Sequence, residues 1–362
     1  MTEKLTRRDF NKLFAVTGGA LSLAACGIIG KQTLTISEEE TREAIKLPSG
    51  RLIIKEATEE GYTIKSIDLI TKETKVLLEP SNFVPKEASV SPDGSFLAVS
   101  GNFNGTEQSR IKIYGLQSYE QLQEIIVDKN ILGKPNWGYH GRYYLAYEIF
   151  EDSDPINKGH ESTTKIVDMR DLSSQTLPNV SNFEFNPEDL NLAGFTRKDG
   201  QKSTAMIFEF DKLLETPLGD KENSDFRGWS PNGKLFSYVN LGNPERNMMI
   251  IDTDTNHKVI LNNALDLNWS PNSEHVAFVQ YLPNDDRRLT VQNLNTGNRK
   301  ILSSVQLYDE DILFLSEKWL AVSDHFEGQS SHVVRLFNTE TGETVNIPNS
   351  NNNQQLLAWS EH

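Results

Sequence analysis

The polar stretch between Phe150 and Thr163 contains the side chains best suited to bind a ligand. Asp152, Asp154 and His160 lie close together there, with two more carboxylates beside them. Carboxylate oxygens suit a hard cation such as calcium, but neither EF-hand spacing nor a glycine-pinned loop is present. We therefore assign no metal to this stretch. It is either a site for a ligand or partner, or an ordinary solvated acidic loop.

A second group of candidate residues combines charges of both signs. Asp285 and Arg287 belong to the run Asp-Asp-Arg-Arg at 285–288, which could hold a partner's carboxylate, although a surface charge pair gives the same pattern. His325 lies in another polar stretch and is the histidine that could meet His160 on one face of the protein. The seven histidines show no His-x-x-His or Cys/His spacing, so we predict no zinc or copper site.

Recognisable catalytic and cofactor-binding motifs are absent from the sequence. It contains no Gly-x-Ser-x-Gly elbow, no GxGxxG turn and no Walker loop. We therefore predict no catalytic residue and no cofactor.

The N-terminus resembles a bacterial export signal of the twin-arginine type. Arg7 and Arg8 are followed by a spaced Phe and Lys, and then by the mostly apolar segment Leu13 to Ala25. That segment is too short to cross a bilayer of about 30 Å as a helix, which needs roughly twenty residues. It is therefore expected to be the apolar region of a signal peptide.

The signal ends in Leu-Ala-Ala-Cys, which resembles a lipobox, with Cys26 as the residue that is acylated and becomes the mature N-terminus. We predict that residues 1–25 are removed and that residues 26–47 form a lipidated tether. The protein would then lie on the periplasmic side of a membrane, the outer membrane being favoured in a Gram-negative cell.

Charge and cysteine content limit the partners further. The chain has a formal charge of −15, and removal of residues 1–25, with four basic and two acidic side chains, makes it −17. Such acidity argues against nucleic-acid binding, which needs a basic surface. Cys26 is the only cysteine, so no disulfide can form; such a chain suits a route that exports proteins already folded in the reducing cytosol.

One motif recurs at intervals of 40 to 48 residues: an apolar or aromatic residue, then Ser or Asn, often Pro, a polar turn and an apolar strand. Its leading residues are Val90, Trp137, Phe185, Trp229, Trp269, Phe314 and Trp359. Each unit ends in a further strand, turn and strand, so it provides four short strands. Repeats of this length and content are typical of propeller blades.

The ends of the repeat array complement each other. The strand around Trp359 lacks a continuation, whereas the strand from Arg51 to Ala57 lacks a first strand before it. We therefore predict an all-β propeller over residues 48–362 with seven blades, or alternatively six or eight, closed by pairing of these two segments. The tryptophans at 137, 229, 269 and 359 are expected in the core between blades, and Trp319 is expected to be buried too.

The Trp-Ser-Pro-Asn-Gly unit at 229–233 and the Asn-Thr-Glu-Thr-Gly hairpin at 338–342 resemble the repeats of TolB-like and WD-repeat-like propellers. The resemblance covers residues 48–362 and implies a propeller fold. TolB-like propellers commonly have six blades, whereas the repeat in this sequence indicates seven.

Function is expected on the loops that join second and third strands, because these are long, polar and unlike one another. They include 150–163, 281–288 and 324–331, which hold the candidate residues named above. The leading hypothesis is a membrane-anchored module that binds a protein partner or a cell-envelope ligand through this loop face. The alternative is a propeller enzyme, a lyase or hydrolase, acting on an oligosaccharide or small molecule in the central channel.

Overall fold

The computed structural model describes residues 46–103, 108–139, 142–150, 162–200, 202–218, 223–241, 247–282, 287–303, 312–325, 332–347 and 354–361. The predicted signal peptide and almost all of the tether lie outside them. Every regular element in the described ranges is a β-strand. A helix long and apolar enough to span a membrane is not found within these ranges.

The strands form seven four-stranded antiparallel sheets, each with one strand innermost and the others following outward. From the inside, blade 1 contains β28 (Gln354–Ser360), β1 (Arg51–Thr58), β2 (Gly61–Asp68) and β3 (Thr74–Ser81). Blade 2 contains β4 (Phe83–Val90), β5 (Phe96–Phe103), β6 (Ser109–Gly115) and β7 (Gln121–Val127). Blade 3 contains β8 (Ile131–Tyr139), β9 (Tyr143–Phe150), β10 (Ser162–Asp168) and β11 (Ser174–Pro178).

Blade 4 contains β12 (Val180–Phe185), β13 (Leu192–Asp199), β14 (Lys202–Glu209) and β15 (Leu214–Pro217). Blade 5 contains β16 (Ser224–Trp229), β17 (Leu235–Asn240), β18 (Met248–Asp252) and β19 (Lys258–Leu261). Blade 6 contains β20 (Ala264–Trp269), β21 (His275–Tyr281), β22 (Arg287–Asn293) and β23 (Arg299–Ser303). Blade 7 contains β24 (Ile312–Ser316), β25 (Trp319–His325), β26 (His332–Asn338) and β27 (Thr344–Asn346).

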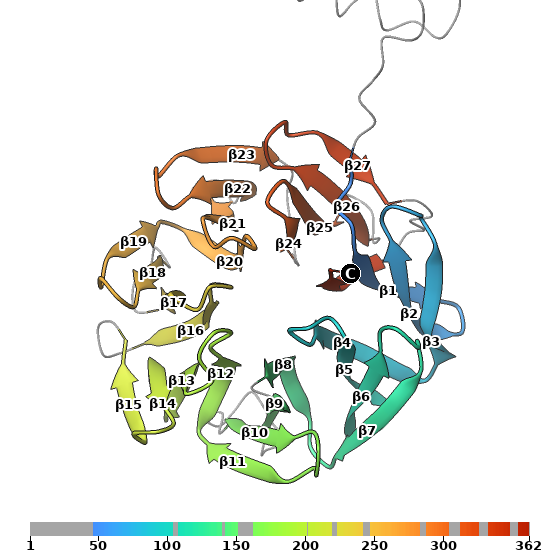
Figure 1. The fold of residues 1–362 in the computed structure, drawn as a ribbon, viewed down its shortest axis with the longest axis horizontal. Helices are drawn as coiled ribbons and strands as arrows, with labels where there is room; N and C mark the ends of the chain where they lie inside the picture. Colours follow the sequence, from blue (N-terminus) through green and yellow to red (C-terminus); the bar gives the residue numbers. More distant parts are fainter. Residues whose placement is uncertain are drawn as a thin grey trace, which may run out of the picture. The chain divides into compact units, whose positions relative to one another are not determined.

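These sheets stand around a central axis, so the unit from Leu47 onward is a seven-bladed propeller (Figure 1). The predicted blade number is confirmed. In each blade the first-to-second and third-to-fourth turns lie on one face of the ring, and the second-to-third loops lie on the other, because successive strands are antiparallel.

The ring closes as the sequence predicts. β28 pairs with β1, with Leu52 opposite Trp359 and Arg51 opposite Ser360. Leu356 of β28 is buried in the cluster shared with blade 7, and Leu357 is buried in the cluster shared with blade 2. The last strand therefore completes blade 1 and removes an inner edge that would otherwise be unpaired.

Seven apolar clusters fill the spaces between neighbouring blades. The cluster around Trp229 and Phe226 of blade 5 includes Ala205 of blade 4, for example. Trp137, Trp229 and Trp319 are buried, as predicted from the repeat. Trp269 and Trp359 are only half-buried, so the repeat position alone does not determine how deeply an indole lies.

The Ser-Pro turns explain why the repeat contains a serine. The Oγ atoms of Ser91, Ser230 and Ser270 each accept a hydrogen bond of 2.9 Å from the backbone N–H five residues later. Each hydroxyl also donates to the Asp or Asn two residues ahead. The serine thus fixes the turn that leads out of the innermost strand.

Several of these turns also contact the next blade. Asn186 Nδ2 donates to the Gly233 carbonyl at 2.8 Å, and the Asn232 N–H donates to Ser273 Oγ at 3.0 Å. The Asn272 N–H donates to Glu317 Oε1 at 2.7 Å. These bonds link blades 4, 5, 6 and 7 in sequence along the turn face.

Candidate functional site

Most of the residues proposed from sequence lie outside the described residues. This holds for Cys26, Arg7 and Arg8 of the signal, and for the loop candidates Asp152, Asp154, His160 and Asp285. Their assignments stay predictions.

Two loop candidates are described. Arg287 begins β22, and its guanidinium carbon lies 4.8 Å from the ring centroid of Tyr281, a cation–π contact within one hairpin. His325 ends β25, and its Cα pairs with that of His332 across the β25–β26 hairpin. Both residues lie at second-to-third loops of neighbouring blades, as predicted, but this geometry does not make them a site.

The innermost strands have a feature that the sequence analysis did not predict. In all seven blades the register between the first and second strands shifts within the innermost strand. The largest interruptions run from Leu132 to Asn136 in β8 and from Ser181 to Glu184 in β12. A smaller shift separates Phe226 from Gly228 in β16. Such β-bulges re-aim side chains, in this case on strands that border the central channel.

A cavity of about 720 Å³ lies against these bulges. Its walls come from β8, β12, β16, β20 and β24, and it reaches Pro187, Pro231 and Pro271, which begin the first-to-second turns. The cavity therefore extends toward the turn face, whereas the predicted binding loops lie on the opposite face. Its volume is within the range of small-molecule sites, about 300 to 1,000 Å³.

Glu184 is the titratable side chain most altered by this environment. Its Oε2 accepts a hydrogen bond of 3.2 Å from the backbone N–H of Trp229 in the next blade. Burial in the wall raises the pKa of Glu184 to about 7, although that hydrogen bond, the Lys134 charge and Asn136 each act to lower it. Part of the side chain still faces the cavity, so a carboxyl that titrates near neutral pH is accessible there.

Gly228 permits this position of Glu184. It has a φ of 138°, which L side chains rarely adopt, and a Cβ at this residue would lie 2.8 Å from Glu184 Oε2. A glycine is therefore needed both for the bulge and for the close approach of the carboxylate.

Glu148 is a second carboxyl on the same wall. Its Oε2 accepts a hydrogen bond of 3.3 Å from the Asn182 N–H, and burial raises its pKa. Lys198 and Asp225, which form an ion pair of 3.4 Å, act on Glu148 with opposite signs. Both of these carboxyls thus hold their protons to a higher pH than free glutamate does. The exposed Glu361 is a third carboxylate that lines the cavity.

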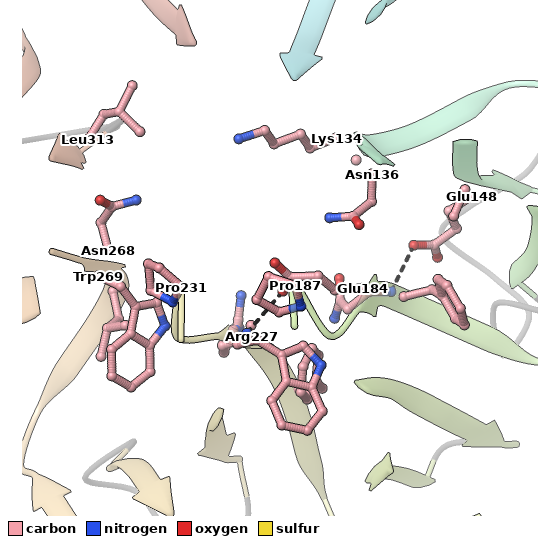
Figure 2. A pocket seen from close by; sticks show the side chains of 18 of the residues that line it. Lys134, Asn136, Glu148, Glu184, Pro187, Arg227, Pro231, Asn268, Trp269 and Leu313 are labelled. Atoms are coloured by element: carbon pink, nitrogen blue, oxygen red, sulfur yellow. Dashed lines mark hydrogen bonds between the residues drawn. The ribbon is translucent and has the colours of Figure 1, made fainter. Parts of the chain in front are cut away.

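Two cations face the same cavity, Lys134 from the bulge of β8 and Arg227 from the bulge of β16. Both side chains are exposed, and neither forms a salt bridge with a carboxylate of the described ranges. Figure 2 shows the Lys134 side chain reaching into the cavity, with Asn136 beside it and Asn268 on the opposite wall.

Two tryptophans form part of the cavity wall. Trp229 is 3 % exposed, Trp269 is half-buried, and both line the cavity. The buried Nε1 atom of each has no hydrogen-bond partner among the described residues. Because both Nε1 atoms are closed off from solvent, the two tryptophans contribute ring surface to the wall and not accessible donors.

The sequence did carry a signal for this site, although it was not recognised. Lys134, Glu184 and Arg227 each precede the leading aromatic residue of a repeat by one to three positions. A charged residue just before the leading residue was therefore a possible sign of a side chain at the channel, although Asp225, another charged residue of β16, pairs with Lys198 and does not line the cavity. In the ranges that the structure describes, no three His, Cys, Asp or Glu side chains gather as metal ligands.

Comparison with known proteins places the chain by fold. No protein-family model matches it, and no curated protein matches it in sequence. The solved structure of TolB from Acinetobacter baumannii is 13 % identical, with a TM-score of 0.54 over 86 % of this chain and 66 % of TolB. This chain therefore spans just under two thirds of that protein.

Two groups of enzymes also contain a similar propeller. Oligogalacturonate lyase from Vibrio parahaemolyticus is 14 % identical, with a TM-score of 0.64 over 81 % of this chain and 87 % of the lyase. Prolyl oligopeptidase B from Galerina marginata is 12 % identical, with a TM-score of 0.60 over 85 % of this chain and 51 % of the peptidase. At these identities the likenesses show a common propeller fold, shared by proteins of different function.

Proposed function

We propose that this chain is an exported, lipid-anchored propeller that binds a small polar ligand in its central cavity. The observation that carries the proposal is a cavity of about 720 Å³ that two cations without a salt bridge, Lys134 and Arg227, line from β-bulges. Few, well-placed polar groups in a concave, partly apolar site are typical of small-molecule recognition.

The cavity can be tested by filling it. Leu313 lines the cavity and is shown at its wall in Figure 2, so Leu313→Trp should occupy part of the space. Leu122→Trp, at a 54 % exposed position on the outermost strand of blade 2, is the matched control. A library of small polar metabolites is screened by ligand-detected NMR against the wild type and both variants.

We expect ligands that bind the wild type and Leu122→Trp but not Leu313→Trp. Binding that persists in Leu313→Trp would place the site elsewhere. If no compound of the library binds the wild type, the proposal of a ligand site in the cavity is wrong.

A catalytic role is the second candidate, and Glu184 is the observation that favours it. A carboxyl with a pKa of about 7 is suited to donate or accept a proton at neutral pH. Glu184→Gln keeps the shape of the side chain but cannot exchange this proton. If the ligand is chemically altered by the wild type and bound unchanged by Glu184→Gln, the propeller is an enzyme; unchanged ligand with both proteins indicates binding alone.

The second-to-third loops are proposed to bind a protein partner or an envelope component at the face opposite the turns. Their residues differ from blade to blade, as surfaces for specific recognition commonly do. The mature protein and a form with Gly-Ser turns in place of 150–163 and 324–331 are compared in pull-downs from detergent-solubilised membranes. Recovery of the same partners by both would exclude a role for these two loops.

Anchoring through Cys26 rests on the signal sequence alone. Labelling of cells with a palmitate analogue should mark the wild type and leave Cys26→Ser unlabelled. Equal labelling of both would place the lipid elsewhere.

A further inference from the structure

The charged side chains of the cavity differ in how many hydrogen bonds and salt bridges they form within the protein. Glu184 and Glu148 each accept a backbone hydrogen bond, from Trp229 and Asn182 respectively. Lys134 and Arg227 have no salt bridge to any described carboxylate. Glu361, the third carboxylate at the cavity, likewise has no salt bridge to a described cation, so the charges left unpaired on the lining are two positive and one negative.

The state of the carboxyls strengthens this imbalance. Burial raises the pKa of Glu184 to about 7 and also raises the pKa of Glu148. Near neutral pH Glu184 and Glu148 consequently carry less negative charge than two free glutamates would. A protonated Glu184 is also a hydrogen-bond donor.

Cations that line a recess act more strongly on a ligand than cations on an open surface, because the walls concentrate the field. Lys134 and Arg227 reach the cavity from bulges on β8 and β16, the innermost strands of blades 3 and 5. The wall between them belongs to blade 4 and carries Glu184. A guanidinium, an ammonium and neutral N–H donors together are the usual partners of a carboxylate.

We propose that the ligand of the central cavity is an organic anion whose carboxylate is held by Lys134 and Arg227. This inference rests on the proposed function, because it concerns the same cavity. The volume of about 720 Å³ leaves room for an organic body much larger than the carboxylate itself. That body would contact the Trp269 and Leu313 side chains on the far wall.

The test uses two sets of three probes that differ in a single terminal group. Gluconate, sorbitol and glucamine share a polyhydroxylated chain that ends in a carboxylate, a hydroxymethyl or an ammonium group. Phenylacetate, 2-phenylethanol and 2-phenylethylamine vary the same groups on an aromatic body. Binding is measured at pH 7 by ligand-detected NMR titration, with Trp fluorescence as a second signal.

In at least one set we expect the carboxylate to bind about tenfold or more tightly than its neutral counterpart, since hydrogen bonds to charged groups are the strong ones. Lys134→Ala and Arg227→Ala should each remove at least about tenfold of that preference. Lys86→Ala is the matched control: Lys86 is an exposed cation at the β4 bulge that does not line the cavity, and its loss should leave binding unchanged.

The outcomes separate the two proposals. Tighter binding of the neutral or ammonium probe, or a carboxylate preference that survives both alanine variants, overturns the anion inference and leaves the cavity as a ligand site. If none of the six probes binds the wild type at concentrations up to about 10 mM, the proposed function fails as well. A dissociation constant above that concentration is weaker than a specific site should give. Thermal melts of each variant verify that the propeller is folded.

Discussion

Replacement of Glu184 by glutamine should change how the stability of the propeller depends on pH. Glutamine keeps the side-chain length and still offers an oxygen to the Trp229 N–H, which Glu184 Oε2 accepts in the wild type. What it removes is the titration of a buried carboxyl. Glu184 is faced by Lys134 and Asn136 from β8, by Trp229 and Arg227 from β16, and by Glu148 from β9 across the same wall.

The size of the effect follows from the pKa of Glu184, which burial raises from 4.5 to about 7. Between these values the folded protein holds a proton that the unfolded chain has released, so the free energy of unfolding falls as the pH rises. Each pKa unit corresponds to about 1.4 kcal/mol, which gives at most about 3 kcal/mol between pH 4.5 and pH 7. Above pH 7 the contribution is constant.

Urea denaturation at pH 5, 6, 7 and 8, followed by tryptophan fluorescence, measures this difference. Relative to the wild type, Glu184→Gln should gain free energy of unfolding steadily from pH 5 to pH 7, by about 2 to 3 kcal/mol in all, and nothing further at pH 8. The titration of Glu148 is present in both proteins and cancels. Glu188→Gln, at an exposed position of the neighbouring turn, controls for the loss of one negative charge. Parallel curves for the wild type and Glu184→Gln would refute the raised pKa.

Three further predictions concern the ring and its turns. Deletion of residues 354–362 should lower the melting temperature by more than about 10 °C, since it exposes the inner edge of blade 1 and two apolar clusters; an unchanged melting curve would contradict closure by β28. Asp93→Asn should destabilise the protein above about pH 4 but not near pH 2. Burial raises the pKa of Asp93, yet hydrogen bonds, among them the one from Tyr143 of the next blade, hold this pKa at about 2. The carboxylate therefore stabilises the fold above its unfolded pKa of 3.8, and that stability is lost as the pH falls toward 2. Acid titration by circular dichroism measures it, and equal acid midpoints would speak against the contact. Gly228→Ala should reduce the free energy of unfolding by about 1 to 3 kcal/mol, because its Cβ would displace the Glu184 carboxylate and its φ of 138° is strained for an L side chain; urea denaturation measures the loss, and an unchanged free energy of unfolding would contradict the strain at this bulge.

The architecture was predictable because the repeat imposes the same physical requirement seven times. Each unit needs an apolar or aromatic residue before the turn that leaves its innermost strand, so the leading residues count the blades. The unmatched strands at the two ends then specify the closure, which the structure confirms with Leu52 opposite Trp359.

The cavity was not predictable to the same degree because it depends on where the repeat is irregular. The extra residues at Gly133 and Asn182 shift the register of β8 and β12 and turn the neighbouring side chains toward the channel. In a regular strand, side chains alternate between the two faces of the sheet, which would direct Lys134 and Glu184 toward neighbouring blades and not toward the channel. Trp269 shows the same limit, since it shares a repeat position with buried Trp229 and yet is only half-buried.

The position of β1 has a mechanical consequence. The chain enters the ring at Arg51, and β1 is hydrogen-bonded on one side to β28 and on the other to β2. A pull on the segment before Arg51 is therefore applied to an interior strand, and two ladders must yield before it can be drawn out. Without β28 the same pull would act on an edge strand held by one ladder. The pairing of β28 thus reinforces the blade at the point where tension from the preceding chain would arrive.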